Sequence, residues 1–372
     1  MVSDQEHPNH AGASGAHAQA GALVISVDAM GGDLGPAAVV AGCVQVLRDD
    51  PALSILLHGN RTQLEPLLAR QTDLAGRIVL CHAERAVTME DKPSHVMRHG
   101  KDTSMWSAIE ALRDGKARAA VSCGNTGALM AVSMLRLRRM EGVTRPAIAC
   151  LWPSRGKYGF NTMLDVGADI KADAPDLLAY AIMGTTYFRN GFNEPRPRVG
   201  LLNVGTEEHK GRAEIKAAHE LIGAHQETGR YEYVGFVEGS DIPSARVDVI
   251  VTDGFTGNVA LKTGEGTARL VGDLLRGALR GGWVSMLGAF LARGSLNRLR
   301  ARIDPRRVNG GVFLGLNGTV VKSHGSADAT GVAAAVRLAA KLAQSGYQGR
   351  MAERLVIAAQ AAQDAGPEGV SE

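Results

Sequence analysis

The chain has 372 residues, of which 45% are hydrophobic and 21% are charged, and its formal net charge is +3. These values are typical of a globular protein with a large buried core, and they exclude a chain that is disordered over most of its length. The weak positive charge is far below that of a dedicated nucleic-acid-binding protein, so we expect no nucleic-acid partner.

Residues 1–21 are rich in His, Ala and Gly and lack the basic and apolar segments of a secretory signal, so we predict a disordered extension. From residue 22 onward β-rich runs alternate with helical patterns, which predicts an α/β protein with a doubly wound, mostly parallel sheet. The predicted strands are 23–27, 53–58, 77–81, 119–122, 147–151, 160–165, 199–204, 231–237 and 247–252. The predicted helices are 36–48, 103–113, 127–138, 173–188, 210–225, 258–279 and 351–362. We expect one domain over 22–345, followed by a C-terminal helix and tail over 346–372.

The four cysteines are scattered and form no CxxC pair, so neither a zinc site nor a disulfide framework is indicated. No apolar run reaches the roughly 18 residues that a membrane-spanning helix needs. We therefore expect a cytoplasmic protein without a bound metal.

Ligands of open α/β sheets bind at the carboxyl ends of the strands, and five turns at predicted strand ends have unusual sequences. The first turn, which follows strand 23–27, contains two carboxylates around a glycine pair. A tight turn alone would explain the glycines, but the two carboxylates favour a binding role. Its candidate residues are Asp28, Gly31, Gly32 and Asp33.

The second turn follows strand 119–122 and leads into a predicted helix. Free N–H groups at such a helix start can bind an anion, which makes this turn a candidate phosphate site. A plain N-cap formed by Asn125 or Thr126 is the alternative. The candidate residues are Gly124, Asn125, Thr126 and Gly127.

The third and fourth turns are rich in charged residues. Lys210 lies in the third turn, over 203–211, among more charges than a turn needs. In the fourth turn Asp253 ends a strand, and Asn258 and Lys262 lie on one face of the next helix. A solvated lysine on a surface helix is the alternative interpretation of Lys262.

The fifth turn places Lys322 and His324 between a predicted strand and a helix. A single histidine is usually structural, but its position beside Lys322 at a helix start favours a functional role. The sequence contains no GxGxxG turn, P-loop, GxSxG elbow or HExxH motif. We therefore expect no nucleotide or other cofactor.

Residues 269–307 combine an apolar helical stripe with many arginines. This combination suits either the surface of an anionic membrane or an acidic protein, whereas a helical hairpin that packs in a dimer is the alternative. The apolar residues are Trp283, Val284, Met286, Leu287, Phe290 and Leu291, the arginines are Arg276, Arg280, Arg293, Arg298, Arg300, Arg302, Arg306 and Arg307, and the opposing acids are Asp273 and Asp304.

Nine short strings together span residues 27–329. They are VDAMGGDLGP, KDTSM, SCGNTGALMA, RPAIA, LDVGAD, GLLNVGTEEHKG, VEGSDI, TDGFTGNVALKT and LGLNGTVVKSHGSADA. In these strings and their order, the chain resembles the phosphate acyltransferase family. The chain departs from the family at Asp169, where Asn is usual, at 206–209, where glutamates are usual, and at Cys123, where a smaller residue is common.

The resemblance implies that a long-chain acyl group passes from acyl carrier protein to inorganic phosphate, giving acyl phosphate. It also implies a homodimer with a three-layer α/β/α fold akin to phosphotransacetylases and to isocitrate and isopropylmalate dehydrogenases. Because the product must reach a membrane-bound glycerol-3-phosphate acyltransferase, the resemblance favours peripheral contact of the Arg-rich segment with the membrane.

From residue type and expected position, we assign Lys262 and Lys322 to phosphate and His324 to the leaving sulfur or the oxyanion. Asp28, Asp33 and Asp253 would orient these cations. A covalent acyl group on Cys123 is an alternative to direct attack by phosphate. A transferase that uses acyl-coenzyme A and a non-catalytic scaffold of lipid synthesis are the rival functions, and a dehydrogenase is disfavoured by the missing dinucleotide motif.

Overall fold

The computed structural model describes residues 23–296, 298 and 310–364. The predicted N-terminal extension and the last eight residues of the predicted tail therefore lie outside the described residues. Within them one sheet has the strand order β3-β2-β1-β4-β11-β10-β5-β6-β9-β7-β8. The strands are β1 Leu23–Asp28, β2 Leu53–Gly59, β3 Ile78–His82, β4 Ala119–Ser122, β5 Ala147–Pro153, β6 Phe160–Leu164, β7 Arg198–Leu202, β8 Glu232–Val237, β9 Val249–Val251, β10 Gly311–Leu314 and β11 Thr319–Lys322.

Two groups of parallel strands run in opposite directions in this sheet. Strands β3, β2, β1, β4 and β11 are parallel to one another, and so are β6, β9, β7 and β8. Between the groups, β10 is antiparallel to β11 and to β5, and β5 is antiparallel to β6. The carboxyl ends of the two groups therefore lie at opposite edges of the sheet.

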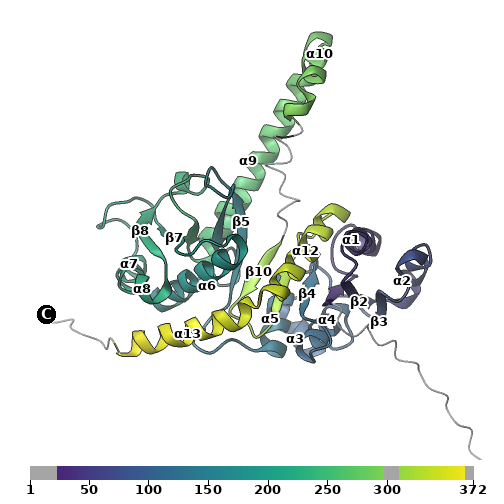
Figure 1. The fold of residues 1–372 in the computed structure, drawn as a ribbon, viewed down its shortest axis with the longest axis horizontal. Coiled ribbons are helices and arrows are strands. Elements are labelled where there is room, and N and C mark those ends of the chain that lie inside the picture. Colours follow the sequence, from purple (N-terminus) through teal and green to yellow (C-terminus); the bar gives the residue numbers. More distant parts are fainter. Residues whose placement is uncertain (1–22, 297, 299–309, 365–372) are drawn as a thin grey trace, which may run out of the picture.

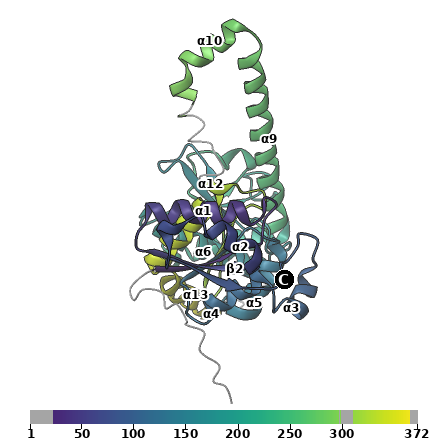
Figure 2. The same ribbon diagram turned by 90° about the vertical axis from the view of Figure 1, so that its right-hand side faces the viewer.

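Helices cover both faces of the sheet, which confirms the predicted α/β/α layers. Apolar side chains alternate along the strands: Val121 and Val321 face one core, and Ala120 and Val320 face the other. The first core includes α1, α6, α7, α12 and α13, and the second includes α4, α5 and the early turns of α9. Figure 2 shows α1 and α12 on one side of β2, with α4 and α5 on the other.

Most helices begin and end within a few residues of the predicted positions. They are α1 Gly35–Asp49, α2 Arg61–Leu68, α3 Pro93–His99, α4 Ser104–Arg113, α5 Thr126–Leu137, α6 Ala174–Phe192, α7 Ala213–Ala224, α8 Gln226–Gly229, α9 Gly254–Arg280, α10 Trp283–Leu291, α12 Ala329–Ser345 and α13 Tyr347–Asp364. The helices α2, α3 and α8 and the strand β10 were not predicted. Each is short, and β10 begins at Gly311, the second of two adjacent glycines that by themselves indicate a loop.

The outer part of α9 and the whole of α10 form an arm that projects from the body (Figures 1 and 2). Trp283 and Phe290 on α10 are 79% and 68% exposed, so the predicted apolar stripe lies on a helix and remains largely exposed. Among the described helices, none is long and apolar enough to cross a bilayer. Arg300, Arg302, Arg306, Arg307 and Asp304 of the predicted Arg-rich segment lie outside the described residues.

Candidate active site

Two predicted site residues, Asp28 and Lys322, lie on either side of Ser122 where β1, β4 and β11 end. The strand register pairs Ser122 with Asp28 on one side and with Lys322 on the other. The Ser122 hydroxyl donates a 2.7 Å hydrogen bond to Asp28 Oδ2. Burial raises the pKa of the Asp28 carboxyl, which is 2% exposed. The first, second and fifth predicted turns therefore meet at one edge of the sheet.

Glycines allow these three turns to touch. A Cβ atom on Gly31 would lie 2.5 Å from the backbone nitrogen of Gly124, which is closer than real Cβ atoms come. The backbone N–H of Asp33 donates to Gly325 O at 2.7 Å and joins the first turn to the fifth. Gly32 has a φ of +105°, which L side chains rarely adopt. The glycines are thus required by close backbone contact between turns.

Lys322 is a partly buried cation within this group of turns. Its Nζ donates to Cys123 O at 3.2 Å and also to Ser323 O. Burial lowers the Lys322 pKa from its usual 10.5 to about 8, and the nearby Asp28 and Asp33 act in the opposite direction. A cation whose pKa lies near physiological pH suits a site that must bind an anion and release it.

Asn125 caps α5 and holds the preceding loop. Its Oδ1 accepts the N–H of Ala128 at 3.0 Å, and its Nδ2 donates to Met89 O and Asp91 O at 3.0 Å each. These contacts agree with the N-cap alternative, and they occupy the side chain that we predicted to bind phosphate. Helix geometry leaves the N–H groups of Thr126 and Gly127 without an intrahelical acceptor, so they remain the candidate anion donors of this turn.

Glu265 joins two of the predicted catalytic residues, although the sequence analysis did not identify it. Glu265 Oε2 accepts from Lys262 Nζ at 3.0 Å, and Glu265 Oε1 lies 3.2 Å from His324 Nε2. The contact with His324, helped by Lys262, lowers the pKa of the Glu265 carboxyl to about 2. The spacing of three residues from Lys262 was the available signal, because it places both side chains on one helical face.

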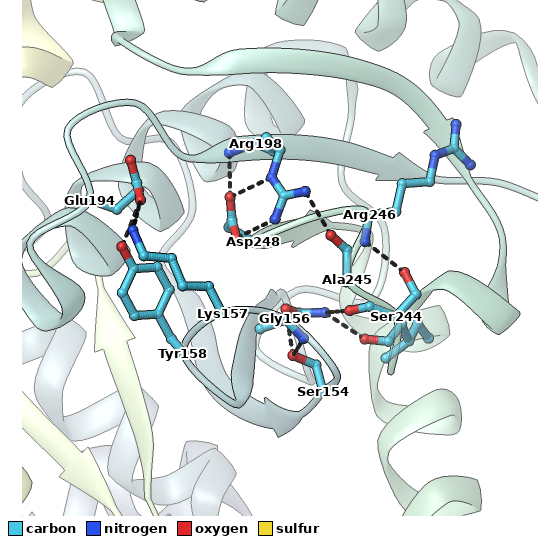
Figure 3. Close-up of polar contacts among 12 residues, drawn as sticks. Ser154, Gly156, Lys157, Tyr158, Glu194, Arg198, Ser244, Ala245, Arg246 and Asp248 are labelled. Atoms are coloured by element: carbon cyan, nitrogen blue, oxygen red, sulfur yellow. Dashed lines mark hydrogen bonds and ion pairs between the residues drawn. The ribbon is translucent and has the colours of Figure 1, made fainter.

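Trp152 at the end of β5 fixes the part of α9 that carries these residues. A Cβ on Gly264 would lie 2.3 Å from the Trp152 ring, so the helix rests directly on the indole. The β5–β6 turn beyond Trp152 is held by polar contacts (Figure 3), among them the Ser154 hydroxyl donating to Asn161 at 2.9 Å. The Asn161 amide in turn donates to Ile242 O at 2.8 Å. The support for α9 is thus anchored in neighbouring loops.

A second ion pair at the same edge stiffens these loops. Arg198 and Asp248 form two hydrogen bonds of 3.0 and 2.9 Å, and Arg198 also donates to Ala245 O at 2.6 Å (Figure 3). Asp248 is 5% exposed, so its charge depends on this partner. Arg198 and Asp248 thus bond to partners within the protein, which indicates that this ion pair has a structural role.

The other predicted site residues lie toward the opposite edge of the sheet. Asp253 accepts the N–H of Thr256 at 2.8 Å and pairs with Arg212. Asn258 contacts Gly167. At about 1.5 Å per residue, Asp253 is roughly 14 Å along α9 from Lys262. Asp253 follows β9, whose carboxyl end lies at the opposite edge of the sheet from Lys322. There it caps the start of α9.

Lys210 pairs with Glu207 at 2.7 Å in the exposed turn after β7. The departure from the family at Asp169 belongs to the same edge, because Asp169 Oδ1 pairs with Arg145 at 3.1 Å. The structure therefore brings Lys262, Lys322 and His324 together and places Lys210 apart from them.

Cys123 is a poor candidate for a nucleophile in this environment. It is 3% exposed, and burial raises the pKa of its thiol, so the reactive thiolate is disfavoured. What remains is a group of two lysines and a histidine beside a helix start. Such a group can hold an anion and can protonate a leaving group.

Comparisons with known proteins add an independent result. The family described as "Fatty acid synthesis protein" matches residues 23–350. The phosphate acyltransferase of Cereibacter sphaeroides is 67% identical over 346 residues, which cover 93% of this chain and 94% of the relative. That of Paracoccus denitrificans is 66% identical over 340 residues, which cover 91% and 92%.

Among solved structures, a phosphotransacetylase from Streptococcus pyogenes is similar with a TM-score of 0.57 and 15% identity, covering 88% of this chain and 95% of the other. The EutD phosphotransacetylase from Staphylococcus aureus gives 0.56 and 15%, covering 87% and 94%. At this identity the similarity supports the predicted fold and carries no argument about substrates.

Proposed function

Because the chain belongs to the fatty acid synthesis protein family and its curated relatives are phosphate acyltransferases, we propose that it transfers a long-chain acyl group from acyl carrier protein to inorganic phosphate. The product, acyl phosphate, would serve phosphatidic acid and phospholipid synthesis. The observation that carries the proposal is the meeting of Lys262, Lys322 and His324 beside the start of α5.

In the proposed reaction hydrogen phosphate attacks the thioester carbonyl carbon. The new carbon–oxygen bond forms and the carbon–sulfur bond breaks, with the electron pair leaving on sulfur. Lys322 and Lys262 hold the phosphate, and α5 adds its free N–H groups. His324 gives a proton to the sulfur, and the proton released by hydrogen phosphate restores the imidazole, so the products are acyl phosphate and free thiol.

An assay of the purified protein with palmitoyl-acyl carrier protein tests this proposal. Thiol release is followed with and without phosphate, and hydroxylamine traps acyl phosphate as the hydroxamate. We expect thiol release that depends on phosphate and yields hydroxamate. Thiol release without phosphate would identify a thioesterase, and turnover with acyl-coenzyme A in place of the carrier thioester would identify the rival donor. No turnover with either donor would favour the scaffold.

The remaining parts of the proposal concern partners and location. We place the protein in the cytoplasm, as a homodimer in peripheral contact with the anionic inner face of the cell membrane, where a glycerol-3-phosphate acyltransferase would use the product. The exposed apolar residues of α10 support this contact, together with Arg276, Arg280 and Arg293. Sedimentation velocity of the purified chain tests the dimer.

A further inference from the structure

The segment 92–101, which contains α3, is a positively charged surface. It carries Lys92, Arg98 and Lys101, together with His95 and His99, and it has no acidic residue. All five side chains are exposed. Among the ion pairs of the described residues, none engages any of these five, so the charges of Lys92, Arg98 and Lys101 face solvent. We call this segment the basic rim.

The basic rim borders the candidate active site. Asn125, which caps α5, bonds to the carbonyls of Met89 and Asp91 just before the rim begins. The Pro93 ring lies against Gly127, and the Met89 methyl lies against Gly325 in the turn that carries His324. A protein docked on the rim would therefore lie next to the turns that hold Lys322 and His324.

The rim is held rigidly at both ends. Arg85 forms a 2.6 Å hydrogen bond to Asp102, and the backbone N–H of Ser104 donates to Arg85 O at 3.0 Å. Pro93 fixes the first turn of α3, and buried Val96 anchors it. A rigid charged surface loses little conformational entropy when a partner binds. A charged segment that only contacts water would not need this anchoring.

We propose that the basic rim docks an acidic carrier protein, so that its thioester reaches Lys322 and His324. This inference rests on the carrier protein donor of the proposed function. Lys92, Arg98 and Lys101 lie in a segment without acids of its own, between Asp91 and the Asp102 that pairs with Arg85, and they complement the acidic surface of such a carrier. A membrane is the less suitable partner, because the rim lacks large exposed aromatic residues and lies at the opposite end of the molecule from α10 (Figures 1 and 2).

Reversal of two rim charges, Arg98→Glu with Lys101→Glu, tests the proposal. Its matched control, Arg70→Glu with Lys216→Glu, makes the same change in net charge at exposed sites elsewhere. Fluorescence anisotropy of labelled holo-acyl carrier protein gives Kd for the wild type and both variants at several salt concentrations. We expect the Kd of the rim variant to be at least tenfold higher than that of the wild type, and the Kd of the control to equal the wild-type value. The wild-type Kd should rise with salt concentration.

Because this measurement needs no turnover, it separates docking from catalysis. An unchanged Kd in the rim variant, or an equal rise in the control, overturns the docking surface even if the wild type turns over the carrier thioester. Loss of binding to anionic vesicles, with carrier affinity retained, would make the rim a membrane surface and also overturns the proposal. A wild type that binds the carrier through the rim but releases no thiol supports docking and contradicts only the proposed reaction.

Discussion

Lys322 has a lowered pKa of about 8, so its charge changes within the working range of the protein. As pH rises through 8 the amine loses its charge and with it the attraction for phosphate. We expect kcat/KM for phosphate to fall above pH 8 by roughly tenfold per pH unit. In Lys322→Arg the fall should disappear, because guanidinium keeps its charge. The control Lys216→Arg should keep it, and a fall that persists in Lys322→Arg would assign it to another group.

Glu265 holds Lys262 and His324 from one side, at 3.0 and 3.2 Å. Removal of its charge in Glu265→Gln should leave both side chains poorly oriented, lowering kcat by about tenfold through His324 and raising KM for phosphate through Lys262. Steady-state kinetics with varied phosphate measures the two constants separately, and Glu265→Asp should recover part of kcat. A rise in KM alone would show that Glu265 acts on binding.

Single residues could be predicted only where local sequence contains the signal. Lys322 ends a strand and His324 follows two residues later, so their place at the carboxyl end of the strand could be predicted. The contact of Glu265 with Lys262 could be predicted from their spacing, but its contact with His324 could not, because His324 is distant in sequence and comes near only when α9 crosses the sheet. Asn125 shows the reverse case, since the same residue type suits a helix cap and an anion site, and only its contacts with 88–91 distinguish them.

The contact between two turns gives a prediction at the scale of elements. Gly31→Ala would place a methyl group 2.5 Å from the Gly124 nitrogen and force the turns after β1 and β4 apart. We expect the free energy of unfolding to fall by about 1–3 kcal/mol and acyl transfer to be lost. Urea denaturation and the thiol assay measure the two effects.

The control is Gly191→Ala, which meets no atom within 4 Å in the last turn of α6. It should leave the free energy of unfolding unchanged or raise it by up to about 1 kcal/mol. Equal losses in both variants would mean that a methyl group at Gly31 has no special effect.

The order of elements was predictable because each strand is a compact β-rich run, and all nine predicted runs contain a strand. The direction of β10 could not be predicted, since the sequence of a four-residue strand that begins at the second of two glycines does not indicate its pairing partner. That strand starts the reversal between the two parallel groups. As a result, Lys210 and Asp253 lie at the opposite edge of the sheet from Lys262, although all three come after strand ends in the sequence.

At the scale of the whole molecule, the two positively charged surfaces, the arm and the basic rim, lie far apart. The tip of the arm lies at one end in both views, and α3 lies at the other (Figures 1 and 2). From Glu265 to Arg280 the helix α9 extends about 22 Å at 1.5 Å per residue, so the arm can reach a membrane while the rim remains accessible. A carrier docked on the rim would then not compete with the membrane.

The last prediction concerns the arm. Trp283 and Phe290 are largely exposed on α10, and burial of two such side chains in a bilayer interface contributes about 4 kcal/mol, or roughly a thousandfold in affinity. Trp283→Ser with Phe290→Ser should therefore abolish flotation with anionic vesicles and leave acyl transfer in solution intact.

The matched control, Ile170→Ser with Val204→Ser, removes exposed apolar side chains from the body and should float like the wild type. If the wild type fails to bind anionic vesicles, or if the arm variant floats equally well, the arm does not act at the membrane. If the arm variant instead sediments as a monomer while the wild type sediments as a dimer, α10 packs against a second copy of the chain.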